Sequence, residues 1–211
     1  MIQIISFDIG GTLVDTSRKN HLKEVLSDYL RQKGLYSADA VNCLKLHDFS
    51  IPEYCQYVGI DDVAKVQNII EQHNQKHILY SDVLQTIRYL KQRYKLVTIS
   101  NAMSLKRNTL SIYEIEEYFD LELYSFQFGS LKPDTKMFLY VEQYFNVNAK
   151  YCLHVGDNRN DICGANRAGW ISVLLNRKNT YKEEEFQGIN KPDYIISNMS
   201  ELLEIVQTTS V

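Results

Sequence analysis

The sequence predicts an α/β fold in which a parallel β-sheet, covered by helices on both faces, carries an inserted α-helical segment. Two patterns predict it. Short apolar, β-branched segments alternate with stretches of helical spacing along most of the chain, which is typical of βαβ units and of a buried parallel sheet. One long stretch after the first apolar segment has helical spacing only, which indicates an insertion into the α/β core.

Six segments have the composition of strands. The first, residues 2–7, is apolar and β-branched, and Asp8 and the pair Gly10 and Gly11 follow it, as expected where a buried strand ends in a tight turn. The other five predicted strands are residues 96–99, 121–125, 151–155, 171–175 and, with a weaker pattern, 193–196.

Helical spacing fills the intervals between these strands. It predicts helices over residues 82–92, 136–144, 161–168 and 200–206. The inserted stretch has no convincing strand, and its four candidate helices are residues 18–32, 38–47, 52–58 and 61–75. We therefore expect a core of residues 1–15 and 80–211, with residues 16–79 as a helical cap.

The composition fits a globular protein and excludes several classes of function. The 211-residue chain is 45% hydrophobic and has a net charge of −3, so it has no basic field for nucleic acid or anionic lipid. Its four cysteines form no C-x-x-C pair, which argues against a zinc or dithiol redox site. We see no secretory signal and no run long enough to span a membrane, and we expect free thiols and a cytoplasmic location.

Polar side chains follow the predicted strands at the points where the strands end. In chain order they are Asp8, Ser100, Asn101, Lys132, Asp157 and Asp161. Because ligands bind at the carboxyl ends of the strands in an open parallel sheet, we expect these side chains to converge. Carboxylates suit a divalent cation, a hydroxyl and an amide suit phosphate oxygens, and an ammonium suits excess negative charge. The pattern indicates a site for one phosphoryl group and one divalent cation.

Four ordered motifs resemble those of the haloacid dehalogenase (HAD) superfamily. They read FDIGGTLV at residues 7–14, TISN at 98–101, GSLKPD at 129–134 and HVGDNRNDICGANRAG at 154–169. The predicted insertion lies where that superfamily carries its smaller cap. The resemblance covers the whole chain. It implies a Rossmann-like, HAD-like core with a helical cap, and a Mg²⁺-dependent phosphatase that acts on a small phosphorylated metabolite.

The resemblance also implies a role for each matching residue. Asp8 would be the nucleophile that forms an aspartyl-phosphate, the usual use of a nucleophilic carboxylate. Asp8 would also bind Mg²⁺, together with Asp157 and the backbone carbonyl of Gly10. Asp161 would orient a metal-bound water or Lys132.

The remaining matches concern phosphate binding and support. Ser100 and the backbone N–H groups that follow it, beginning with Asn101, would bind the transferring phosphoryl oxygens. Lys132 would neutralise charge and keep Asp8 ionised. Thr12 would stabilise the turn.

Position 10 departs from the pattern. Phosphatases of this superfamily carry a second aspartate two residues after the nucleophile, where this chain has Gly10. Glycine keeps a carbonyl for the metal, but it has no side chain to protonate the leaving alcohol or to deprotonate the attacking water. Loss of such acid–base help typically costs about 10²–10⁴-fold in rate. We therefore expect the metal and phosphate site to persist while turnover of ordinary phosphate monoesters falls.

The departure leaves other hypotheses open. A dehalogenase of the superfamily would have Tyr at this position and no need of Asp157 for metal, so retention of Asp157 disfavours that branch. Another possibility is a protein that binds phosphorylated ligands and turns them over slowly or not at all. A side chain near the cap could also replace the missing acid on closure, and Asp15, His47 and Glu53 are the candidates.

A phosphonatase has a small residue at this position and a cap lysine that forms a Schiff base. The candidate cap lysines lie in no motif that resembles that branch, which disfavours the hypothesis. They are Lys19, Lys23, Lys33, Lys45, Lys65 and Lys76.

Overall fold

The computed structural model describes residues 1–16, 22–73, 78–106, 110–179, 181–182 and 185–208. Its core is a six-stranded parallel sheet with the order β5-β4-β1-β6-β7-β8. The strands are β1 (Ile4–Phe7), β4 (Lys95–Ser100), β5 (Leu121–Tyr124), β6 (Cys152–Gly156), β7 (Ile171–Leu175) and β8 (Tyr194–Ile196). All six correspond to predicted strands, and the predicted α/β fold is confirmed.

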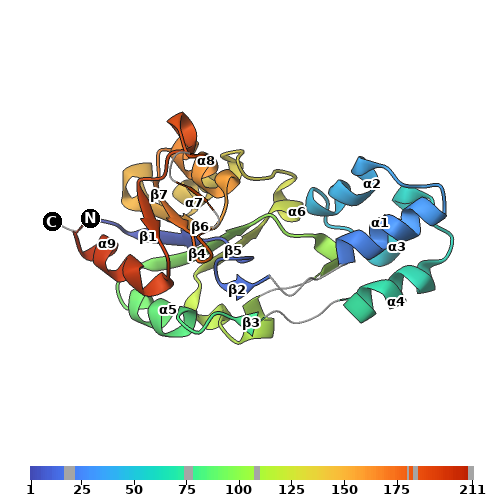
Figure 1. Cartoon of the computed structure of the whole chain (residues 1–211), viewed down its shortest axis with the longest axis horizontal. Coiled ribbons are helices and arrows are strands. Elements are labelled where there is room, and N and C mark those ends of the chain that lie inside the picture. The colour runs from blue at the N-terminus through green and yellow to red at the C-terminus, as the bar shows by residue number, and fades with distance from the viewer. Residues whose placement is uncertain (17–21, 74–77, 107–109, 180, 183–184, 209–211) are drawn as a thin grey trace.

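Helices cover both faces of this sheet (Figure 1). One face is covered by α5 (Val83–Lys91) and α9 (Leu202–Thr208), and the other by α7 (Lys136–Phe145) and α8 (Arg159–Ala168). These are the four helices predicted outside the cap. A one-turn helix, α6 (Ser125–Phe128), follows β5, so residue 125 begins a helix and does not end the strand as predicted.

Alternation along β1 explains the two faces, because successive side chains of a strand point to opposite sides. Ile5 and Phe7 pack in the apolar cluster that includes Ile87 of α5, whereas Ile4 packs in the cluster that includes Phe138 of α7. All of these side chains are 0% exposed. The central strand is therefore buried from both sides, and the residues that follow it reach the carboxyl edge of the sheet.

The inserted segment forms a helical cap beside the core (Figure 1). Its elements are α1 (Leu22–Gln32), α2 (Ala38–Asn42), the 3₁₀ turn η1 (Cys43–Lys45), α3 (Ile51–Val58) and α4 (Val63–His73). The cap has its own apolar cluster, which includes the fully buried Leu26 and Tyr54. Met103 and Leu105, from the loop after β4, also pack in this cluster. The cap is therefore seated on that loop.

The two crossings between core and cap pair with each other. Strand β2 (Val14–Asp15) lies antiparallel to β3 (Ile78–Leu79), with Val14 opposite Leu79. The expectation that residues 16–79 contain no strand is therefore wrong at residues 78–79. A two-residue strand has no periodicity for a sequence pattern to reveal, and only its long-range partner defines it.

The remaining short elements are 3₁₀ turns: η2 (Ser104–Lys106), η3 (Leu110–Tyr113), η4 (Glu116–Tyr118), η5 (Ala149–Tyr151), η7 (Gly188–Asn190) and η8 (Met199–Glu201). All four cysteines are buried as free thiols. Among the described residues, we find no helix with the length and apolar character required to cross a bilayer.

Candidate active site

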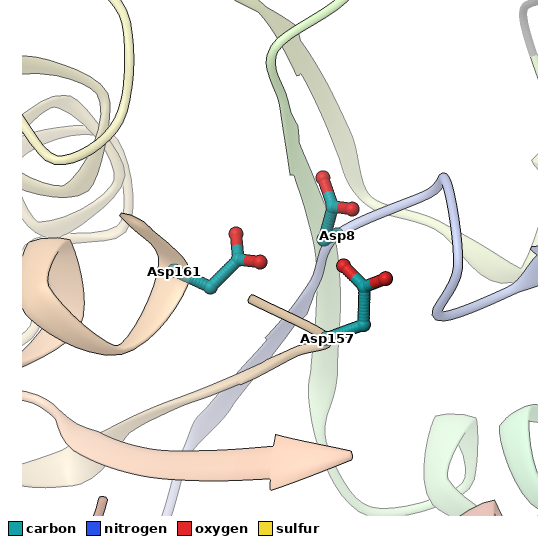
Figure 2. A group of neighbouring side chains, drawn as sticks. All are labelled: Asp8, Asp157 and Asp161. Atoms are coloured by element: carbon teal, nitrogen blue, oxygen red, sulfur yellow. The ribbon is translucent and has the colours of Figure 1, made fainter. Parts of the chain in front are cut away.

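Three aspartates meet at the carboxyl edge of the sheet (Figure 2). Asp8 follows the central strand β1, and its backbone N–H donates to the Val155 carbonyl of β6 at 2.9 Å. Asp157 comes directly after β6, and Asp161 lies in the first turn of α8. One carboxylate oxygen from each aspartate lies within 4.8 Å of the other two. The fold thus brings together residues that are far apart in the sequence.

Lys132 joins two of these carboxylates. Its Nζ lies 2.7 Å from Asp8 Oδ1 and 2.5 Å from Asp161 Oδ1, and it donates to the Ile99 carbonyl at 2.6 Å. The residue is 3% exposed. An ammonium has three donors, and these three contacts use them all. Asn101 fixes the backbone of Lys132, because its side chain accepts from Lys132 N at 2.9 Å and donates to Lys132 O at 3.2 Å.

Asp161 is held as an ionised carboxylate. The backbone N–H of Asn158 donates to Asp161 Oδ2 at 3.3 Å in a capping box that begins α8. Burial acts to raise the pKa of Asp161, but Lys132 and His154 outweigh it and lower the pKa to about 2. Gly156 permits this approach, since a Cβ there would lie 2.3 Å from Asp161 Cβ.

His154 links this carboxylate to the interior of the sheet. Its Nε2 lies 3.3 Å from Asp161 Oδ1, and its Nδ1 lies 2.6 Å from Ser6 Oγ. Burial lowers the pKa of His154 against the opposing effect of Asp161, so we assign the neutral ring with its proton on Nε2, where it can reach Asp161. The sequence predicts a packed or hydrogen-bonded core residue at His154, and the structure identifies Asp161 and Ser6 as its partners. Ser6 and His154 are register partners in β1 and β6, so two polar residues inside apolar strands were the available signal.

The site carries excess negative charge. Burial raises the pKa of Asp8, Lys132 lowers it, and Asp161 and Asp157 raise it, with a net value of about 7. Burial and the charge of Asp161 also raise the pKa of Asp157. Three carboxylates and one ammonium leave two negative charges, which a divalent cation would balance.

Asp157 packs against the turn after β1. Gly11 has a φ of +82°, and a Cβ on it would lie 1.9 Å from Asp157 Oδ2, so no larger residue fits at this position. Asp157 Oδ1 accepts from the Asn158 side chain at 3.0 Å. A cavity of about 70 Å³ adjoins Asp157 and Gly11 and is also lined by Arg177, which leaves room for several water molecules.

Gly10 keeps its carbonyl available. Gly10 lies opposite Val14 in an isolated β-bridge. The hydrogen bonds of this bridge run from Val14 N–H to the Ile9 carbonyl and from Gly11 N–H to the Val14 carbonyl, so they leave the Gly10 carbonyl unused. A Cβ on Gly10 would meet Thr16 Cγ2 at 3.3 Å, so a larger side chain fits only if the threonine methyl moves by a few tenths of an ångström. Leaving out its chain neighbours, the described atom that a Cβ on Gly10 would meet is this methyl carbon, which cannot act as an acid.

The two predicted hydroxyl residues differ in their surroundings. Ser100 ends β4 and is 7% exposed at the same edge as Asp8. Thr12 is 0% exposed, and its hydroxyl has no hydrogen-bond partner among the described residues. Its carbonyl instead accepts from Arg177 at 3.2 Å. If Thr12 supports the turn, it does so in this structure through its backbone.

Arg177 is a residue that sequence reasoning missed. Its guanidinium forms two hydrogen bonds to Asp82, at 2.7 and 2.9 Å, and lies 4.0 Å from the centre of the Tyr80 ring. The Tyr80 hydroxyl donates to Asp15 Oδ1 at 3.3 Å. The loop after β7 is thereby tied to β2 and to the residue after β3, where the chain crosses between core and cap. Nothing in the sequence around Arg177 signals this pairing.

The predicted substitutes for the missing acid are engaged elsewhere. Asp15 accepts from Tyr80, and the Glu53 carboxylate binds Ser50 in the capping box of α3. His47 is exposed and packs against the rings of Phe49 and Tyr57.

The candidate cap lysines differ in exposure. Lys23, Lys33 and Lys65 are exposed, whereas Lys45 is partly buried and its charge interacts with that of Asp8. Lys19 and Lys76 lie outside the described residues.

An α/β core with a helical cap, and a buried aspartate–lysine pair at the end of the central strand, define the class of capped α/β hydrolases. The family model described as haloacid dehalogenase-like hydrolase matches residues 5–175. The chain therefore belongs to this family.

Relatives and solved structures match along nearly the whole chain. Pyrophosphatase PpaX of Bacillus mycoides (strain KBAB4) is 26% identical over 215 residues, with 97% of each chain covered. Glyceraldehyde 3-phosphate phosphatase of Methanopyrus kandleri is 26% identical over 229 residues, with 98% of each covered. A HAD phosphatase structure from Thermococcus onnurineus has a TM-score of 0.70 at 25% identity and covers 97% of this chain and 98% of that one.

Dehalogenase structures share the fold as well. A 2-haloacid dehalogenase from Pseudomonas syringae pv. Tomato DC3000 has a TM-score of 0.74 at 23% identity, with 99% of each chain covered. At this identity the likeness concerns the fold alone, and the choice between phosphate and haloacid chemistry rests on the site.

Proposed function

We propose that this protein is a Mg²⁺-dependent phosphatase that hydrolyses a small phosphorylated metabolite through a phospho-Asp8 intermediate. The observation that supports it best is the buried Lys132, whose Nζ lies 2.7 Å from Asp8 Oδ1 and 2.5 Å from Asp161 Oδ1. The Asp157 carboxylate lies beside these two carboxylates. Both curated relatives described above carry names of phosphate-releasing enzymes. The four free thiols suit a reducing compartment, and we propose a cytoplasmic location.

The residues fit a Mg²⁺ ion. Asp8 and Asp157 each have one carboxylate oxygen without a protein partner among the described residues, and the Gly10 carbonyl lies outside the neighbouring bridge. Asp161, by contrast, is already occupied by Lys132, His154 and Asn158. Mg²⁺ takes one or two carboxylates and keeps several waters, and the cavity beside Asp157 has room for them. The ion would neutralise charge on the transferring phosphoryl group.

The chemistry assigned to the chain's own residues begins at Asp8. Its free carboxylate oxygen attacks phosphorus. The bond between phosphorus and the leaving-group oxygen breaks, its electron pair stays on the leaving-group oxygen, and an aspartyl-phosphate forms. Water then attacks phosphorus, releases inorganic phosphate and regenerates Asp8. Lys132 keeps the carboxylate ionised and oriented in both steps, and Asp161 and His154 fix Lys132. Gly10 supplies no proton to the leaving oxygen.

The test uses the purified protein with Mg²⁺ and two substrates, p-nitrophenyl phosphate and an alkyl phosphate. We expect the wild type to favour the aryl ester, whose leaving group needs no proton. Gly10→Asp should raise kcat/KM for the alkyl ester by about 10²–10⁴-fold. The same change paired with Thr16→Ser removes the methyl group that a new Cβ would meet at 3.3 Å. Asp8→Asn should be inactive, and acid-quenched wild type should carry a phosphoryl group by intact mass.

Fast wild-type turnover of the alkyl ester would show that another acid replaces position 10. If Asp8→Asn retained activity, the proposed nucleophile would be wrong. Gly10 also favours a second candidate, a protein that binds phosphorylated ligands without efficient turnover. In that case every variant is inactive, while phosphorylated ligands still raise the Tm of the wild type.

A further inference from the structure

Lys45 is a cap cation whose charge interacts with that of Asp8. Lys45 ends η1, which packs beside η2 and α6, the segments that follow β4 and β5 at the carboxyl edge of the sheet. The three aspartates and Lys132 all come from the core. Lys45 therefore lies in a cap element that packs at this edge of the sheet, and its charge interacts with that of Asp8.

Lys45 has no partner in the part of the chain that the structure describes. It is partly buried, yet its ammonium forms no hydrogen bond or ion pair with a described residue. Burial and the nearby Lys23 ammonium lower the pKa of Lys45, and Asp8 acts in the opposite direction. Asp8 offsets part of this cost, but its carboxylate is already paired with Lys132, so a further bound anion would stabilise the charged form of Lys45.

Substrate geometry determines which anion this is. In phosphoryl transfer the attacking and leaving oxygens lie roughly in line. Because Asp8 attacks from the core, the leaving group must point toward the cap, where Lys45 lies. The phosphoryl charge itself is met on the core side by Lys132 and the proposed metal ion.

We propose that Lys45 binds a second anionic group on the leaving side of the substrate and so selects phosphate compounds that carry one. This inference rests on the proposed function and specifies its substrate class. The second group is a carboxylate or a further phosphate, and Lys23 adds to the positive field that attracts it. Where the second group is a phosphate, the site also compensates for Gly10, because phosphate departs as a stabilised anion and needs no proton.

The test compares substrates with and without a second anionic group, and the Lys45 variants separate the effect of that charge from leaving-group reactivity. One pair is 2-phosphoglycolate and 2-hydroxyethyl phosphate, in which a carboxylate is replaced by a hydroxymethyl group. The other is pyrophosphate and methyl phosphate. We expect higher kcat/KM for the doubly anionic member of at least one pair, and the pair that responds identifies the source of the second anion. Lys45→Met should reduce that preference by about 10- to 100-fold, and Lys45→Arg should keep most of it. Lys65→Met, an exposed cap lysine, should leave it unchanged.

A binding measurement separates this inference from the proposed function. Methylene diphosphonate, which resists hydrolysis, should raise the Tm of the wild type more than methylphosphonate does, and Lys45→Met should abolish the difference. This result with no turnover would retain the role of Lys45 and refute the phosphatase. Turnover with no charge preference in either pair would refute the role of Lys45 and retain the phosphatase. Borohydride trapping of an aldehyde-bearing phosphonate on Lys45 would also overturn the proposed role of Lys45, because the lysine would then act as a nucleophile.

Discussion

Replacing Lys132 by Met removes the ammonium that two carboxylates of the site share. The side chain is 3% exposed, with Nζ 2.7 Å from Asp8 Oδ1 and 2.5 Å from Asp161 Oδ1. Met has a similar length and an apolar stem, so the substitution mainly removes charge. The variant leaves Asp161 as a buried anion without its cation, and Asp8 loses the contact that lowers its pKa.

Removal of one partner from a buried ion pair costs about 3–5 kcal/mol, which for a chain of this length lowers Tm by roughly 6–20 °C. We expect this loss at pH 8 in EDTA. It should be smaller at pH 5, because both carboxylates have higher pKa values without Lys132 and take up protons as the pH falls. Mg²⁺ should recover part of the loss by supplying positive charge.

Lys95→Met is the matched control. Lys95 pairs with Asp120 at 3.0 Å, but its side chain is 58% exposed, and such surface pairs contribute about 0–1 kcal/mol. Urea unfolding at both pH values, with thermal unfolding in parallel, measures the difference. Equal losses for Lys132→Met and Lys95→Met at pH 8 would refute the view that Lys132 neutralises the site.

Two further predictions concern the turn after β1 and the crossing between core and cap. Gly11→Ala should abolish turnover and weaken Mg²⁺ binding, because its Cβ would lie 1.9 Å from Asp157 Oδ2. Gly34 is the matched control, since it has a similar φ of +70° and a Cβ there would have no atom within 4 Å. Gly34→Ala should cost only the roughly 1–3 kcal/mol of backbone strain. Activity assays and urea unfolding of the two variants distinguish these effects. Burial acts to raise the pKa of Asp82, but Arg177 outweighs it and holds the pKa below its usual value. A depressed carboxyl pKa stabilises the fold above the unfolded-state value and loses that contribution as pH falls through the folded-state value. The free energy of unfolding of the wild type should therefore fall more steeply below about pH 4 than that of Arg177→Met, and parallel curves would contradict this role.

The sequence was informative wherever strand order alone determines position. Asp8 and Asp157 follow adjacent parallel strands, so their proximity follows from the βαβ pattern once the order β4-β1-β6 is assumed. Lys132 was harder, because it comes from a loop, and only the motif order drew attention to it. Its position depends on the hydrogen bonds of Asn101, which no local pattern reveals.

Other parts of the site depend on contacts between distant segments. Arg177 reaches Asp82 across 95 residues, and the pairing of β2 with β3 joins segments on either side of the whole cap. Lys45 was one of six similar cap lysines in the sequence, and only the packing of η1 against the core distinguishes it. These features follow from tertiary packing, which acts after the local pattern has been set.

The loop after β4 belongs to both halves of the molecule. It begins at Ser100 and Asn101, beside the nucleophile, and a few residues later Met103 and Leu105 are packed in the interior of the cap. Leu105 is 6% exposed, so lifting the cap away must either expose this leucine to water or pull the loop along. Opening of the cap and the positions of Ser100 and Asn101, the residues proposed to bind the phosphoryl group, are consequently linked: the cap cannot move away without disturbing this loop.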